Sequence, residues 1–174
     1  MDKKLQNQAL GPLAITIRPA ASEDADEIAH IFLESAEHHA RLDPERYWVP
    51  AVDAISSRYR EGRQHPPGPR AESITLVAEL DGEIAGFIDV RLEQSPDPMH
   101  RELIYCHVAE LAVGRPYQNQ SVGARLLQAA EDWGRRQGAD FASLEYHVAN
   151  TRASDFYQRR VGYSVAASIA IKRL

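Results

Sequence analysis

Residues 109–127 read AELAVGRPYQNQSVGARLL, and this stretch decides how the chain folds. Its start belongs to an apolar run, 102–113, whose two alternating faces are apolar apart from His107 and Glu110, which is typical of a central strand covered on both sides. Its end opens an amphipathic helix, expected over about 121–137, with apolar side chains at helical spacing at Val122, Leu126, Ala130 and Trp133. A strand that leads into a helix through a short polar loop predicts a mixed α/β fold. The same arrangement makes the loop at 117–123 a candidate phosphate site.

The flanking segments predict the order β α α β β β α β α β. Further strands are expected at 13–20, 73–80, 83–93, 140–148 and 163–174, and further helices at about 22–41, 50–62 and 150–162. The dipeptide Asp81-Gly82 is the strongest short signal for a two-residue hairpin turn. Three consecutive antiparallel strands followed by two βα units predict one mixed sheet in one domain.

The overall composition restricts the class of protein. A chain of 174 residues with 44% hydrophobic and 26% charged residues suits one globular domain, expected at 14–174 after a short disordered lead-in at 1–13. The net charge of −5 argues against general nucleic-acid binding. The single cysteine, Cys106, excludes an intrachain disulfide and favours a cytoplasmic location. No apolar run approaches the roughly 20 residues that span a bilayer, so no membrane partner is expected.

Two signatures resemble those of a known family. The stretch 109–127 resembles the acyl-CoA-binding signature of the Gcn5-related N-acetyltransferase (GNAT) superfamily, in which a strand ending in an E-L-x-V-like run precedes R/Q-x-x-G-x-G/A. The stretch NTRASDFYQRRVGY at 150–163 resembles the second signature, N-x-x-A-x-x-F-Y followed by G-F or G-Y. The similarity covers roughly residues 14–174. It implies the GNAT fold, an α/β (α+β) domain with a mixed, mainly antiparallel sheet of six to seven strands flanked by about four helices.

The loop at 117–123 has a physical reason to bind a pyrophosphate. The first turn of a helix leaves backbone N–H groups unpaired and carries partial positive charge. By family alignment Gln118 takes the R/Q position, Ser121 the first glycine and Gly123 the second, while Asn119 stands where many relatives have glycine. We expect Ser121 to adopt helical φ and to add its hydroxyl as a phosphate donor, because a residue that opens a helix needs no positive φ. The alternatives are that Ser121 crowds the pyrophosphate, or that the loop is only a connection.

The resemblance also implies which residues hold the acyl-CoA. The expected contacts are the backbone of Leu111, Ala112 and Val113, beside a bulge that exposes it, and the loop residues Gln118, Asn119, Gln120, Ser121, Val122, Gly123 and Ala124. Asn150 is expected to cap its helix and to hydrogen-bond the pantetheine arm. The candidates for the 3′-phosphate are Arg115, Arg125, Arg152 and Arg159, each of which could equally belong to a solvated helix face.

Acetyl transfer requires a neutral amine, a donor to the developing oxyanion and a proton for the departing thiolate. Glu110 resembles the family's general base, and burial is expected to raise its pKa. The alternative is a structural acid paired with an arginine or a helix terminus. Tyr157 matches the family's general acid, because a phenol of pKa ~10 is protonated at neutral pH. The alternative for Tyr157 is a core residue beside Phe156.

Other chemically capable residues carry weaker hypotheses. Cys106 is expected to be a buried hydrophobe rather than an acyl carrier. His38 and His39 could line the acceptor pocket, supply a second base or lie on the surface, and adjacent histidines on a helix do not face the same way, so no metal site is expected. Tyr47 and Trp48 could either line the acceptor pocket or fasten their loop to the core.

The sequence therefore predicts an N-acetyltransferase that moves acetyl from acetyl-CoA to a primary amine of a small molecule or peptide, by direct transfer in a ternary complex. A catalytically inactive CoA-binding regulatory domain is the alternative, with Ser121 in its favour, and a pure interaction module is a third reading. The acidic Glu34, Glu37 and Asp43 mildly favour a cationic acceptor. A homodimer is compatible with the sequence.

Overall fold

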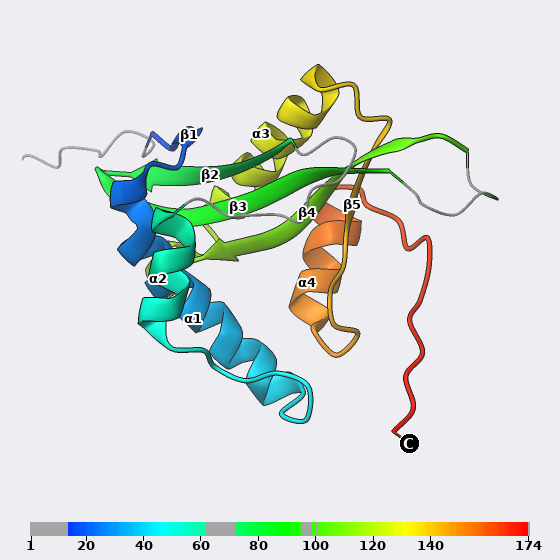
Figure 1. The fold of residues 1–174 in the computed structure, drawn as a ribbon, viewed down its shortest axis with the longest axis horizontal. Helices are drawn as coiled ribbons and strands as arrows, with labels where there is room; N and C mark the ends of the chain where they lie inside the picture. The colour runs from blue at the N-terminus through cyan, green and yellow to red at the C-terminus, as the bar shows by residue number, and fades with distance from the viewer. Residues whose placement is uncertain (1–13, 62–71, 95–98, 100, 174) are drawn as a thin grey trace, which may run out of the picture.

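The computed structural model describes residues 14–61, 72–94, 99 and 101–173. The predicted lead-in at 1–13 lies outside the described residues. The described chain forms one twisted sheet with helices on both faces (Figure 1). This is the mixed α/β class expected from the sequence.

Within the described ranges the sheet has five strands, in the order β1-β2-β3-β4-β5. They are β1 (Thr16–Pro19), β2 (Ser73–Leu80), β3 (Glu83–Gln94), β4 (Ile104–Val113) and β5 (Phe141–Leu144). All neighbouring pairs are antiparallel except β4 and β5, which are parallel. The β2–β3 turn is the predicted hairpin, since Asp81 and Gly82 both have positive φ, 54° and 82°, as a type I′ turn requires.

The helices cover the two faces of the sheet separately. One core cluster joins Ile28 of α1 (Ala25–Leu42) and Tyr59 of α2 (Val52–Arg60) to Phe87 of β3. The other joins Leu126 of α3 (Val122–Arg136) to Ile88 of β3. Figure 1 accordingly shows α1 and α2 on the side of the sheet opposite α3. Four short elements complete the described part of the fold: η1 (Ser22–Asp24), η2 (Arg115–Tyr117), α4 (Thr151–Asp155) and a π-helical turn that continues α4, η3 (Phe156–Arg160).

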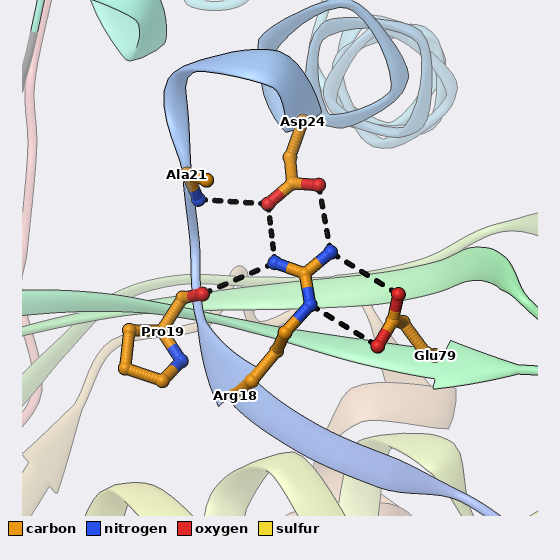
Figure 2. A network of polar contacts seen from close by, with 5 residues as sticks. All are labelled: Arg18, Pro19, Ala21, Asp24 and Glu79. Atoms are coloured by element: carbon orange, nitrogen blue, oxygen red, sulfur yellow. Dashed lines mark hydrogen bonds and ion pairs between the residues drawn. The ribbon is translucent and has the colours of Figure 1, made fainter.

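Arg18 links the first short helix, η1, to the sheet through hydrogen bonds and ion pairs. Arg18 of β1 donates two hydrogen bonds to Asp24, at 2.6 and 2.8 Å, and pairs with Glu79 of β2 at 3.1 Å (Figure 2). Asp24 also accepts a hydrogen bond from the N–H of Ala21 at 2.8 Å. The hydrogen bonds from Arg18, and to a smaller extent the one from Ala21, hold the pKa of Asp24 below its usual range. The network links β1 and β2 to the short helix η1 that precedes α1.

The predicted sixth strand does not form, so the expected sheet of six to seven strands is wrong in number. Residues 163–173 have no strand hydrogen bonds, and 164–173 are all exposed. An alternating apolar pattern favours an extended backbone, but a strand exists only when a neighbour supplies its hydrogen bonds. The predicted fifth strand is also shorter than expected, because its pairing with β4 ends at Leu144.

Candidate active site

The pairing of β4 with both of its neighbours is interrupted near its middle, by a bulge toward β3 and by separation from β5. Glu110 faces Asp89 on β3, but the next pair is Val90 with Val108, so Ala109 has no opposite residue. On the other side, the pairing of β4 with β5 ends at Val108 and Leu144. Beyond this point, within the described residues, β4 keeps only β3 as a ladder neighbour. The backbone of Leu111, Ala112 and Val113 therefore lies beside an open edge. The bulge next to it is the one that the family resemblance implies.

The loop after β4 uses left-handed backbone at the positions aligned with glycines. Asn119 has φ 64° and Ser121 has φ 65°, whereas Gly123 lies inside α3 with no positive φ. The expectation that Ser121 takes helical φ is wrong. Ser121 is the N-cap residue of α3 in the left-handed region, exposed, and its side chain makes no capping hydrogen bond. The tight turn that glycines usually permit is made here by two residues with side chains.

Side chains of the loop and of α4 stabilise this turn. Gln118 donates from Nε2 to the carbonyl of Val113 at 3.1 Å, and Gln120 donates to the carbonyl of Pro116 at 2.9 Å. Arg152 of α4 donates to Oε1 of Gln118 at 2.7 Å. The guanidinium thus lies against the loop. Sequence reasoning named Arg152 only as one of four candidates, because nothing local distinguishes it from its neighbours.

The start of α3 fits a pyrophosphate. The helix has 15 residues, and its first turn contains no acidic side chain. Its first turn has unpaired N–H groups, the exposed Ser121 precedes it, and Arg152 donates to the loop that leads into it. Val122 itself is buried, and Ala124 is half-buried on the same turn, so their backbone rather than their side chains is offered to a ligand.

Gly123 brings the two signature segments together. A methyl group added there would lie 3.6 Å from the Phe156 ring and 3.6 Å from Val113. The start of α3, the end of β4 and η3 therefore meet at one point. Asn150 caps α4 as predicted, since its side chain accepts a hydrogen bond from the N–H of Ala153 at 3.0 Å.

Tyr157 lies in the π-helical turn, in a cluster of rings. Its ring centroid is 5.1 Å from Phe156, 5.6 Å from Tyr146 and 6.1 Å from Tyr163. Burial raises the pKa of Tyr157 to about 12, and the negative charge of Glu110 adds to the shift. The phenol is therefore protonated at neutral pH.

Glu110 approaches from the other face of the sheet. It is half-buried and stands opposite Asp89, a fully buried carboxylate that accepts a hydrogen bond from Tyr59 of α2 at 2.8 Å. Directly opposed residues of an antiparallel pair point to the same face, so Glu110 belongs to the α1–α2 side. Tyr157 packs with the cluster under α3. A carboxylate and a phenol thus come from opposite faces at the place where β4 and β5 diverge.

The end of α1 and two loops form the neighbouring surface. Tyr47 lies 5.4 Å from His39 and 6.1 Å from His147, between ring centroids, and His147 lies 3.4 Å from Asp43. Through these ring contacts Tyr47 packs its loop against α1 and against the loop after β5. The Trp48 side chain, by contrast, is 81% exposed. Partial burial, followed by the charge of His39, lowers the pKa of His38, so His38 is neutral at pH 7.

The acidic residues near this surface are paired within the protein. Arg115 forms an ion pair with Glu37, and its backbone N–H donates to Glu34 at 2.8 Å. Asp43 pairs with Arg46 at 2.5 Å. Their charges are largely compensated, which weakens the sequence argument for a cationic acceptor. Arg159 is likewise engaged, with Asp155 at 3.4 Å, while Arg125 is exposed on α3.

Cys106 lies under α3, away from the opening. It is buried, donates weakly to the carbonyl of Ala130, and burial raises its pKa to about 11. The thiol is inert at neutral pH, as the sequence predicts. A cavity of about 460 Å³ near Arg18 and Tyr117 contains neither Glu110 nor Tyr157.

Neither a metal-type cluster nor a membrane-spanning helix occurs among the described residues. In these ranges no cluster of three or more His, Cys, Asp or Glu side chains could hold a metal ion. No helix in the part of the chain that the structure describes has the length and apolar content needed to cross a membrane.

The family model described as the Acetyltransferase (GNAT) family matches residues 43–163. The chain belongs to the GNAT family. The match contains both segments discussed above, the loop before α3 and the π-helical turn with Tyr157. GNAT membership supports acetyl transfer as the general activity.

Curated relatives of this GNAT protein carry N-acetyltransferase names. It is 28% identical over 149 residues to the uncharacterized N-acetyltransferase YhfO of Bacillus subtilis, covering 86% of this chain and 89% of that protein. It is 30% identical over 87 residues to an aminoalkylphosphonate N-acetyltransferase of Salmonella typhimurium, covering 50% of this chain and 54% of that one.

Solved structures share the GNAT fold at lower identity. A tetramutant of the BH1408 protein from Bacillus halodurans superposes with a TM-score of 0.79 at 21% identity, over 91% of this chain and 99% of that one. AAC(6′)-Iy, solved with the bisubstrate analog CoA-S-monomethyl-acetylneamine, superposes with a TM-score of 0.65 at 15% identity, over 92% and 98% of the two chains. At these identities the likeness concerns the fold alone.

Proposed function

We propose that this GNAT protein transfers acetyl from acetyl-CoA to a primary amine of a small molecule or peptide, directly and in a ternary complex. One observation carries the proposal: the loop before α3 and the pair Glu110 and Tyr157 lie at the same end of β4, where the sheet opens. The first feature suits a pyrophosphate, and the second suits proton transfer at a thioester placed beside it.

Binding is assigned mainly to backbone groups, with a few polar side chains. The N–H groups of residues 119–124, the Ser121 hydroxyl and Arg152 would hold the pyrophosphate. The open edge of β4 at Leu111, Ala112 and Val113 offers backbone donors and acceptors to the pantetheine arm, which has amide groups of its own. Asn150 would contribute the part of its amide that does not cap α4.

Acetyl-CoA supplies an activated acyl group whose carbon–sulfur bond breaks as the new carbon–nitrogen bond forms. Glu110 would take the proton that the attacking amine loses, directly or through water, and Tyr157 would give its phenolic proton to the sulfur. With a pKa near 12, Tyr157 holds that proton at neutral pH until a strong base forms beside it. Aiming Tyr157 at the sulfur requires a fixed ring, and the cluster with Phe156, Tyr146 and Tyr163 provides the packing.

The acceptor would bind between the end of α1 and the loop after β5, where His38, Tyr47 and His147 gather. Relatives named for aminoalkylphosphonate and for aminoglycosides support a small-molecule amine. Since Glu34, Glu37 and Asp43 are already paired with basic residues, we do not assign them to binding a cation. We further propose one domain at 14–174 and a cytoplasmic location, consistent with a lone, buried cysteine.

Calorimetry with acetyl-CoA, together with a thiol-release assay over a panel of amines, tests the proposal. We expect micromolar binding and turnover on at least one amine. Tight binding with no turnover on any amine would support an inactive CoA-binding domain instead. A complete lack of binding would leave only an interaction module.

Tyr157→Phe tests the proton donor. We expect kcat to fall by roughly 100-fold or more, the usual size of a lost general acid, while the Kd for acetyl-CoA changes by less than about threefold. Tyr146→Phe is the matched control, since its ring lies 5.6 Å away in the same cluster and it is not assigned a proton. An unchanged kcat in Tyr157→Phe would remove Tyr157 from this role.

A further inference from the structure

Asp89, in the second half of β3, is a buried carboxylate that the proposed function leaves unused. It is 1% exposed, and each of its oxygens accepts a hydrogen bond. Oδ2 accepts from the Tyr59 hydroxyl at 2.8 Å, and Oδ1 accepts from the Thr75 hydroxyl at 2.5 Å. Burying a carboxylate is costly unless hydrogen bonds replace its water. The two hydroxyl groups meet that need and hold Asp89 at a fixed place inside the protein.

The residues that hold Asp89 are themselves held by the core. Thr75 is the direct register partner of Asp89 on β2, and Tyr59 comes from α2. The Tyr59 ring packs edge-on against Phe87, with 5.5 Å between the ring centroids, and Phe87 is fully buried. Asp89 therefore keeps its position relative to the strand beside it, β4.

The bulge in β4 places Glu110 on the same face as Asp89. In a regular strand, residues two apart share a face, so Glu110 would point to the same side as Val108. Val108 and its partner Val90 belong to the core cluster under α3. The extra residue, Ala109, shifts the alternation by one, and Glu110 lies directly opposite Asp89. Without the bulge the two carboxylates would lie on different faces.

Two carboxylates that face each other in this way affect each other's protons. Side chains at opposed positions of an antiparallel pair have Cβ atoms about 4.5–5.5 Å apart. At that distance a like charge makes it harder for the second group to lose its proton, and burial strengthens the effect because less water screens it. Asp89 is buried with both oxygens hydrogen-bonded, whereas Glu110 is half-buried beside the opening. Glu110 is therefore the member of the pair that takes up a proton.

We propose that Asp89 is a positioning residue for Glu110, whose affinity for a proton it raises through its own fixed negative charge. This inference rests on the proposed function, in which Glu110 takes the proton that the attacking amine loses. A base with a higher pKa accepts that proton more readily, as long as the base is ionised at the working pH. Asp89 is buried, so it acts through Glu110 and not on the substrate.

The elements around Glu110 carry further titratable groups, all of which remain when Asp89 alone is replaced. Tyr157 of η3 interacts with the charge of Glu110, and its pKa of about 12 leaves it neutral below pH 9. Burial lowers the pKa of His38 on α1 and of His107 on β4. The corresponding groups of α2 and of the segment after β5 are Tyr59 and Glu145. A comparison of wild type with Asp89→Asn thus isolates one charge.

Carbon-13 NMR of the glutamate carboxyl groups tests the proposal in the free protein. The Glu110 signal is identified by its absence in Glu110→Gln and is followed from about pH 4 to 8.5. Asp89→Asn is expected to lower the pKa of Glu110 by about one unit or more, because the neighbouring charge is gone. Asp53→Asn, which removes an exposed carboxylate from α2, is the control and is expected to shift it by less than about 0.2 units. A Glu110 pKa that is the same in wild type and Asp89→Asn overturns the proposal.

Tyr59→Phe gives a second measurement that does not alter the buried carboxylate. This variant keeps the ring contact with Phe87 and removes one hydrogen bond to Asp89. Since that hydrogen bond favours the charged form of Asp89, its loss lets Asp89 take a larger share of the proton that the pair binds. The pKa of Glu110 is expected to fall again, by a smaller amount. If Asp89→Asn does not fold, an unchanged Glu110 pKa in folded Tyr59→Phe overturns the proposal instead.

Kinetics separate this inference from the proposed function. With an amine that the panel identifies as an acceptor, the acidic limb of kcat/KM is expected to move to lower pH in Asp89→Asn, by the same amount as the pKa of Glu110. The Kd for acetyl-CoA is expected to stay within about twofold. A limb that stays in place while the pKa moves would show that Glu110 is not the base, and the positioning role would fall with it. If no amine is acetylated, the proposed function fails, and the NMR titration still decides whether Asp89 acts on Glu110.

Discussion

At the scale of single residues, the loop before α3 shows how a phosphate-type turn forms with few glycines. Asn119 and Ser121 both adopt left-handed backbone, at φ 64° and 65°. This conformation costs a non-glycine residue roughly 1–2 kcal/mol, less for Asn, whose side chain bonds locally. Ser121 bears that cost without a capping hydrogen bond in return. Backbone strain at this exposed position is consistent with the binding role proposed for Ser121.

Substitutions at Ser121 distinguish the cost of its backbone strain to stability from the contribution of its hydroxyl to ligand binding. Ser121→Gly is expected to raise the free energy of unfolding by roughly 0.5–1 kcal/mol, because glycine accepts positive φ without penalty. Ser121→Val is expected to lower it by about 1–2 kcal/mol, since a β-branched side chain is the least compatible with this backbone. Urea unfolding measures both, and calorimetry with acetyl-CoA on Ser121→Gly reports the share of the hydroxyl in binding. Equal stability of the Gly and Val variants would contradict the left-handed assignment.

At the scale of elements, α3 packs closely against β4 because Gly134 has no side chain at the contact. A methyl group built on Gly134 would lie 2.6 Å from Cβ and 2.7 Å from Sγ of Cys106, distances that real side chains do not reach. The buried helix and the strand thus approach each other at one pair of small residues. Cys106 precedes the bulge of β4, where the candidate site begins.

Gly134→Ala is therefore expected to destabilise the protein by about 1–3 kcal/mol, despite the better helix propensity of alanine. Gly123→Ala is the control, because a methyl group there would make only ordinary contacts at 3.6 Å. Cys106→Ala is expected to leave the Gly134→Ala defect largely in place, since the closest atom, Cβ, remains. Thermal unfolding of the single and double variants measures this. A stabilising effect of Gly134→Ala would show that α3 and β4 are further apart.

At the scale of the whole molecule, buried acids with raised pKa values make stability depend on alkaline pH. The pKa of Cys106 is raised to about 11 and that of Tyr157 to about 12, chiefly by burial, and burial also raises that of Tyr163. A folded pKa above the unfolded value means that the unfolded chain loses the proton first as pH rises. The stabilising contribution is complete below the unfolded pKa and is lost as pH rises through the folded value.

The free energy of unfolding is accordingly expected to fall from about pH 9, with each group contributing up to about 1.4 kcal/mol per pH unit between its two pKa values. Tyr163→Phe is expected to flatten the decline above pH 10, and Cys106→Ala the part between about 9 and 11. Urea titrations at intervals from pH 8 to 11.5 measure the slopes. Parallel slopes in wild type and both variants would refute the assignment.

The sequence alone determined the class of fold, the order of elements from β1 to η3 and the two segments that build the candidate site. It did so because local rules suffice there: a two-residue turn at Asp81-Gly82, a cap at Asn150 and helical spacing in α3. Backbone conformation at Ser121 was mispredicted, because the helix geometry that follows does not reveal the turn that precedes it.

Only the tertiary structure decided which side chains come together near the separation of β4 and β5. Glu110 and Tyr157 come from opposite faces and from segments 47 positions apart, and their approach depends on where β4 and β5 diverge. The place of Arg152 against the loop is a packing result of the same kind. The fate of residues 163–173 was undecidable from their pattern, since alternation specifies an extended chain, whereas a strand also needs the hydrogen bonds of a neighbour.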